Sequence, residues 1–316
     1  TLTGALAVDG GTVKLDGNYP TGTDNVALGN TSLGNVEAGG TNNVAIGDDS
    51  LKALTTGDNN TAVGYRSLKT AVTSLSNTAI GSLALCTNTG GNNTAIGANA
   101  MECNTSGDNN TAVGKQANFK NTTGASNTSI GNEALKCNTT ASNNTAVGRL
   151  SLAANTTGTQ NTAVGFCSLN ANTTGANNVA IGVQALDTNT TANENVAVGR
   201  CSLFSNTEGT KNIAIGSYSL DTNSTGDSNI AIGYQALDAN TTADNNVAVG
   251  DSALKANTTG TNNVAVGKDA LLANVSGQQN VAIGVCALNA NTGYNNVAIG
   301  YQALDANIGG DSNVAV

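Results

Sequence analysis

Apolar and polar residues alternate over a very short stretch that recurs along almost the whole chain. The phrase Asn-(Thr/Val/Ile)-Ala-(Val/Ile)-Gly repeats from Asn25 to the C-terminal residue at a period of about 17 residues, and such a fixed period is the mark of a repeat architecture. An alternation of three to four residues closed by glycine is typical of a short β-strand. Fitted to this period, the repeating unit reads N-[TVI]-A-[VI]-G-x-x-[AS]-L-x-A-N-T-T-G-x-N.

The length and composition of the unit define the fold class. A unit of about 17 residues is too short for a pair of helices, and its dominant Asn, Thr and Gly are poor helix formers. The x-A-L-x-A segment predicts a second short strand, and N-T-T-G supplies a turn. Stacked units of this kind form an all-β fold, a parallel β-solenoid or β-roll of about 17 residues per coil.

The repeat also divides the chain into two parts. Residues 1–24 lie outside the period, and we interpret them as an N-terminal cap or as the end of a preceding shaft. Residues 25–316 form an array of about eighteen repeats. The last copy stops at Val316, one residue before its expected glycine, so we expect the array to continue beyond it.

Two asparagine columns run through the array. One Asn stands four residues before each glycine, and a second stands seven residues after it from Asn88 to Asn307. Asn side chains stacked in register form amide ladders that stabilise parallel strands. We therefore predict a structural ladder in preference to ligand binding, represented by Asn144, Asn161, Asn178, Asn195, Asn212, Asn229, Asn246 and Asn263.

Both faces of the predicted strand are restricted. The residue before the glycine is always aliphatic, and the residue two before it is Ala in every copy except at Ser129. Because strand side chains alternate between faces, these two columns point in opposite directions. One interior explains one restricted face, so we expect the Ala face to be buried against another copy of the chain. This predicts an elongated homotrimer; tight packing within one chain is the open alternative.

Composition argues against most enzymatic functions. The chain has no His and no Trp, only 10% charged residues, and 12 Lys plus Arg against 21 Asp plus Glu, a net charge of −9. The lack of His removes imidazole catalysis and imidazole metal ligation. The scattered carboxylates form no marked pair, and the G-G-x-G-x-D calcium repeat is absent. We expect no catalytic residue, no cofactor, no metal site, no nucleic-acid partner and no membrane insertion.

The six cysteines are expected to be free thiols. Cys167 and Cys201 share a column but lie two coils apart, as do Cys103 and Cys137. Two coils span about 9.6 Å at ~4.8 Å per coil, which exceeds the reach of a disulfide.

The repeats resemble two families of surface appendages. Asn178-Val179-Ala180-Ile181-Gly182 resembles the head repeats of YadA-like trimeric adhesins, although those repeats are shorter. The longer phrase from Asn144 to Gly158, and the lead-in from Lys14 to Pro20, resemble tail-fibre proteins of marine phages, including cyanophages.

The tail-fibre resemblance implies a non-enzymatic, trimeric part of the virion that serves host attachment. Its implied partners are other virion tail proteins and a host cell-surface glycan or protein, and no binding residues are carried over. A bacterial trimeric adhesin head at the cell surface is one alternative. An ice-binding β-solenoid is an alternative of a different class, because such solenoids present rows of Thr.

Overall fold

A computed structural model describes residues 24–37 and 39–316, so nearly all of the predicted cap at residues 1–24 lies outside the described residues. The described chain is all-β, with 18 short parallel strands and no helix among its residues. Successive strands lie one repeat apart in sequence and pair in parallel. The predicted parallel β-solenoid is therefore confirmed.

The described chain forms two compact units, one ending at Thr123 and one running from Gly124 to Val316. The first unit contains β1 Val26–Leu28, β2 Val44–Ile46, β3 Thr61–Val63, β4 Thr78–Ile80, β5 Thr94–Ile96 and β6 Thr111–Val113. The second unit contains β7 Thr128–Ile130, β8 Thr145–Val147, β9 Thr162–Val164, β10 Val179–Ile181, β11 Val196–Val198, β12 Ile213–Ile215, β13 Ile230–Ile232, β14 Val247–Val249, β15 Val264–Val266, β16 Val281–Ile283, β17 Val297–Ile299 and β18 Val314–Ala315.

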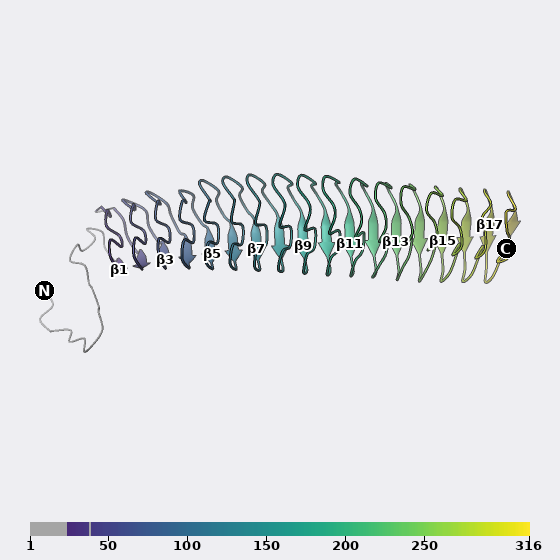
Figure 1. The fold of residues 1–316 in the computed structure, drawn as a ribbon, viewed down its shortest axis with the longest axis horizontal. Coiled ribbons are helices and arrows are strands. Elements are labelled where there is room, and N and C mark those ends of the chain that lie inside the picture. Colours follow the sequence, from purple (N-terminus) through teal and green to yellow (C-terminus); the bar gives the residue numbers. More distant parts are fainter. Residues whose placement is uncertain (1–23, 38) are drawn as a thin grey trace, which may run out of the picture. The chain divides into compact units, whose positions relative to one another are not determined.

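Within each unit, every strand pairs in parallel with the strand of the next coil (Figure 1). The register places like residues together, as where Ala180 on β10 pairs with Ala197 on β11. Each column of the repeat is thus a row of neighbouring side chains on consecutive coils. A column with one residue type marks one repeated environment.

The glycine that ends each strand, here called the closing glycine, is required by the stacking. Gly199 has φ +137°, and a Cβ built on it would lie 2.6 Å from the carbonyl oxygen of Gly216 in the next coil. A φ of this size is accessible essentially only to glycine. The column is invariant because both the backbone conformation and the approach of the next coil exclude a side chain.

The predicted second strand in the x-A-L-x-A segment is wrong. In the coil that follows β10, Gln184 has φ +57° and Leu186 has φ +53°, and the segment is a series of turns. A left-handed Leu costs about 1–2 kcal/mol. Leu186 is fully buried, and burying a Leu side chain contributes about 1.5–3 kcal/mol, which offsets that cost.

The core of each coil consists of the Ala column of the strand and the Leu column of the turn segment. Ala180 is fully buried beside the Leu column, whereas its neighbour Ile181 is 41% exposed. The expectation that the Ala face meets another copy of the chain is therefore wrong. Tight packing inside one coil demands Ala, and the aliphatic residues of the strand point outward.

Candidate functional site

The eight predicted ladder residues lie in one buried column, each directly before a strand of the second unit. Their Oδ1 atoms accept the backbone N–H of the next Asn in the column at 2.9–3.0 Å, as for Asn144 and Asn161. Their Nδ2 atoms donate to a turn carbonyl at 2.8–2.9 Å. This column therefore joins side chain to backbone, with direct amide-to-amide bonds only at some steps, as from Asn178 to Asn161 at 3.2 Å.

The second asparagine column is the one that links amide to amide. Asn172 donates through Nδ2 to Oδ1 of Asn155 at 2.9 Å, and Asn189 donates to Asn172 at 2.8 Å. The carbonyl of Gly175 accepts from Asn172 at 2.9 Å and from Asn161 at 2.8 Å. Both columns therefore donate to the same carbonyl oxygen of the turn. Buried amides with full partners are structural groups, and they are closed to ligands and glycosylation.

The outward side of the strands forms a distinct surface, here called the sheet face. It consists of the first and third residues of each strand, as in Val179 and Ile181. The third residue is Val, Ile or Leu throughout, and the first is Thr, Val or Ile. Isoleucines of the third position are exposed along both units: Ile46, Ile80, Ile96, Ile130, Ile181, Ile215, Ile232, Ile283 and Ile299. An apolar surface that continues over many strands is typical of an interaction site.

The composition of the sheet face changes along the second unit. In β7, β8 and β9 the first strand residue is Thr, whereas from β10 onward it is Val or Ile. The later strands thus present two aliphatic side chains each. The Thr rows of the earlier strands lie on a regular sheet, and rows of this kind are the surface that the ice-binding alternative requires.

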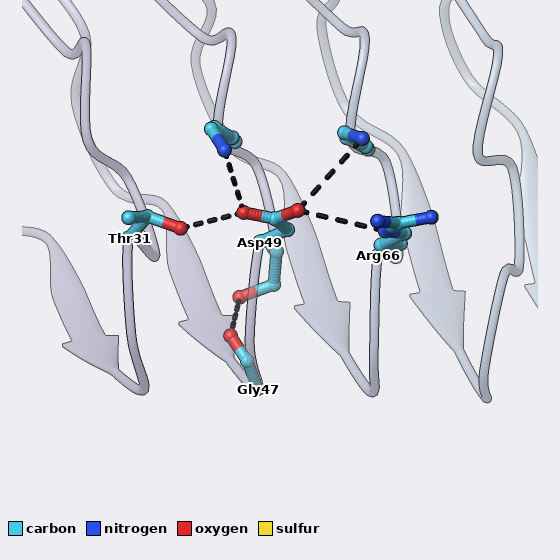
Figure 2. Close-up of polar contacts among 7 residues, drawn as sticks. Thr31, Gly47, Asp49 and Arg66 are labelled. Atoms are coloured by element: carbon cyan, nitrogen blue, oxygen red, sulfur yellow. Dashed lines mark hydrogen bonds and ion pairs between the residues drawn. The ribbon is translucent and has the colours of Figure 1, made fainter.

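The residues two and five positions after each closing glycine form a second surface, here called the turn face. Side chains at these two positions contact each other within a coil, as where Lys52 Nζ lies 2.8 Å from Oδ1 of Asp49. Thr31 Oγ1 donates to the same carboxylate at 2.6 Å from the preceding coil. Arg66 Nε lies 3.5 Å and Lys69 Nζ 3.8 Å from Oδ2. Figure 2 shows the carboxylate between these groups.

This network lowers the pKa of its central group. The hydrogen bond from Lys52, followed by that from Thr31, lowers the pKa of Asp49 to about 2, against an opposing contribution from burial. Three cations around one carboxylate keep Asp49 ionised at every physiological pH. The arrangement satisfies a buried charge and has no feature of an acid–base catalyst, whose pKa would lie near the working pH.

A second polar group lies on and beside the turn face in the coils of β11, β12 and β13. The rings of Tyr218 and Tyr234 meet edge to face with 6.2 Å between centroids, and Arg200 stacks over Tyr218 at 5.4 Å. Burial raises the pKa of Asp221, with a further contribution from the charge of Asp238. The exposed Tyr65, Tyr234 and Tyr301 all directly follow a closing glycine. The turn face and the positions that adjoin it thus carry local polar clusters that differ from coil to coil.

The other sequence candidates are not brought together. All six cysteines are free thiols, and burial raises the pKa of Cys86, Cys103, Cys167 and Cys201, which opposes thiolate chemistry. Within residues 24–37 and 39–316, no three His, Cys, Asp or Glu side chains are grouped to hold a metal ion. The same residues contain no helix that could cross a membrane.

Comparison with known proteins gives no indication of function, so inference about function rests on the sheet face and the turn face. No family model matches the chain, and no curated protein is significantly similar to it.

Proposed function

We propose that the chain is a non-enzymatic, structural segment of a trimeric phage tail fibre that serves host attachment. The repeats stack into coils that act as a stiff spacer, and three chains associate through their sheet faces. The observation that carries this proposal is the exposed aliphatic column of the sheet face. The resemblance of the repeat phrase to tail-fibre repeats supports the phage assignment over a bacterial adhesin head.

The restriction of the sheet face is hard to explain within one chain. Ile181 is 41% exposed and Ile215 is 39% exposed, yet the column admits only Val, Ile and Leu. Solvated strand positions normally vary in polarity, because a side chain in water makes few specific contacts. A second layer of protein on this face supplies the missing constraint.

Charge is distributed in the way that an interface requires. Neither outward strand position carries a charged residue in any copy of the repeat. The described ion pairs lie on the turn face, as between Lys136 and Glu133 at 3.0 Å. Depletion of charge at the centre of a contact is typical of protein interfaces. Because the sheet face is the same on every chain, it suits a closed cyclic assembly. In a three-fold arrangement, each of three chains buries its sheet face against the other two.

The test is the native mass of the protein and its response to charge on the sheet face. We expect light scattering to give about three times the chain mass of 31.1 kDa. Ile181→Lys with Ile215→Lys is expected to yield a folded monomer, because lysine is tolerated in water and not in an apolar contact. The matched control adds two lysines to the turn face, Asn170→Lys with Gln184→Lys beside Asp187, and is expected to remain trimeric.

A monomeric wild-type protein would overturn the trimeric fibre. If that monomer also produced thermal hysteresis in freezing solutions, the Thr rows of the earlier strands would identify an ice-binding solenoid. A trimer that survives both sheet-face lysines would place the interface elsewhere.

A further inference from the structure

One turn of the first unit lacks a residue that its neighbours have. The step from Gly81 to Gly97 is one residue shorter than the next step, from Gly97 to Gly114. The hydrogen bonds identify the missing position: Asn88 donates to the carbonyl of Gly90 at 2.8 Å, and Asn104 donates to that of Gly107 at 2.9 Å. Gly90 therefore corresponds to Gly107. The hydroxyl of Thr89 donates to the carbonyl of Thr105 at 2.7 Å, as the hydroxyl of Thr105 does to the carbonyl of Thr122 at 2.8 Å, so Thr89 corresponds to Thr105 and the short turn has no counterpart of Ser106.

The preceding coil shows the other side of the gap. Asn60 donates to the carbonyl of Ser74 at 2.8 Å, which makes Ser74 the equivalent of Gly90 and Thr73 the equivalent of Ser106. Thr73 and Ser106 thus flank the short turn, two coils apart, with no equivalent residue between them, and Thr89 of the short turn lies beside them. The spacing of two coils is about 9.6 Å.

The gap opens into a groove of about 420 Å³. Gly91 contributes no side chain to the surface of the groove. The N–H of Gly91 donates to Oδ1 of Asp108 at 2.7 Å. Leu75 is 50% exposed on one side of the groove. Ser74 also lines it, is 4% exposed, and its hydroxyl has no hydrogen-bond partner. The volume lies within the range of small-ligand sites.

We propose that this groove binds a neutral pyranose unit of a saccharide. Thr73 and Ser106 offer hydroxyl groups, and the exposed amides of Asn92 and Asn109 offer both donors and acceptors. Leu75 offers an apolar surface for the C–H face of a sugar ring. The carboxylate of Asp108 accepts from sugar hydroxyls and disfavours anionic ligands. This site would serve the attachment role proposed above, on which its biological meaning rests.

The chain contains a natural counterpart in which the same position is filled. The step from Gly284 to Gly300 is shortened by the same single residue, and Asn291 donates to the carbonyl of Gly293 at 3.1 Å as Asn88 does to Gly90. Tyr294 N–H donates to Oδ1 of Asp311 at 2.7 Å, the same bond that Gly91 makes. Tyr294 therefore occupies the position of Gly91, which shows that a tyrosine fits on this backbone.

The experiment is saturation-transfer NMR on the full chain with methyl glycosides of glucose, mannose, galactose and N-acetylglucosamine. At least one of these neutral probes is expected to receive saturation, with a dissociation constant on the order of 1 mM, and the methyl glycoside of glucuronic acid is expected to receive less. Gly91→Tyr is expected to abolish the transfer by filling the groove as Tyr294 does. Ala176→Tyr adds the same ring at the equivalent position beside a full-length turn, and is expected to leave the transfer unchanged.

Transfer that is absent for all four neutral probes, or equal in wild type and Gly91→Tyr, would overturn the site. Thr73→Val with Ser106→Ala provides a second test that leaves the backbone untouched, and at least three-fold weaker binding is expected. The native mass of the same samples separates the two proposals, because a trimer without saccharide binding contradicts only the groove, and a monomer that binds contradicts only the trimer.

Discussion

The sheet face and the turn face are both outward surfaces, yet the sequence treats them very differently. At the third strand position only Val, Ile and Leu occur, whereas the turn face holds Asp49, Tyr218, Cys286 and many other types at one equivalent position. The third strand position is aliphatic in every copy, although it is exposed, as at Ile232 with 37%. Exposure together with restriction indicates that a partner covers the sheet face, and exposure with variation indicates that water covers the turn face.

The largest expected effect on stability comes from the closing glycine, which lies between the sheet face and the turn face in sequence. Gly199→Ala forces a left-handed side chain against the carbonyl of Gly216, so we expect a loss of stability of about 3 kcal/mol or more. Chemical denaturation measures this loss. Gly309→Asn is the control, because a Cβ at Gly309 meets no atom within 4 Å at φ +70° and Asn tolerates that conformation. Equal losses in the two variants would contradict the stacking role of the closing glycine.

A stabilising change is expected at a position of the buried Leu column that holds a polar residue. Asn118 occupies the Leu column of the first unit, and both polar atoms of its buried side chain lack hydrogen-bond partners. Its φ of +49° matches the Leu residues of the same column. Asn118→Leu should therefore raise stability by about 1–2 kcal/mol in denaturation experiments. Met101→Leu, in the same column, should change it by less than about 1.5 kcal/mol, and a destabilised Asn118→Leu variant would disprove this view of the interior.

A matched pair of aliphatic residues compares the two faces directly. Ile283→Thr on the sheet face should weaken the assembly by about 1 kcal/mol per chain, because it removes apolar contact area. Leu272→Thr on the turn face of the preceding coil should change assembly by less than about 0.5 kcal/mol. Sedimentation equilibrium measures both. Equal effects would remove the distinction between the faces.

The smallest expected effect concerns the polar network of the turn face. The folded-state pKa of Asp49, about 2, lies below its ordinary value of 3.8, so ionised Asp49 stabilises the fold above pH 3.8 and that contribution disappears as pH falls through 2. Since its cationic partners are partly exposed, Asp49→Asn should cost only about 0.5 kcal/mol at neutral pH. Thermal unfolding should show the difference vanish near pH 2; a difference that persists there would contradict an electrostatic origin.

The sequence period predicted most of the fold, and the reasons for its failures are physical. The Asn and closing-glycine columns revealed the coil because each depends on a stereochemical demand that recurs once per repeat. The second strand was wrong because a buried Leu186 at φ +53° has no sequence signature of a left-handed turn. The sequence could not show that the side chain of Ala180 points into the coil, because both faces of its strand are apolar. The groove could be located only from the hydrogen-bond register, because the one-residue deletion alone does not show which side chain is missing.

Hydroxyl-radical footprinting of the native assembly tests the central claim that the sheet face is covered by partner chains. Ile181 and Ile283 are 41% and 40% exposed in a single chain, and Val275, in a turn away from the sheet face, is 47% exposed. We expect the two isoleucines to be oxidised several-fold less than Val275 in the assembly. In the monomeric variant with Ile181→Lys and Ile215→Lys, we expect Ile283 to become as strongly oxidised as Val275. Oxidation of all three side chains in proportion to their single-chain exposure would show that the sheet face lies in water, and would contradict the account.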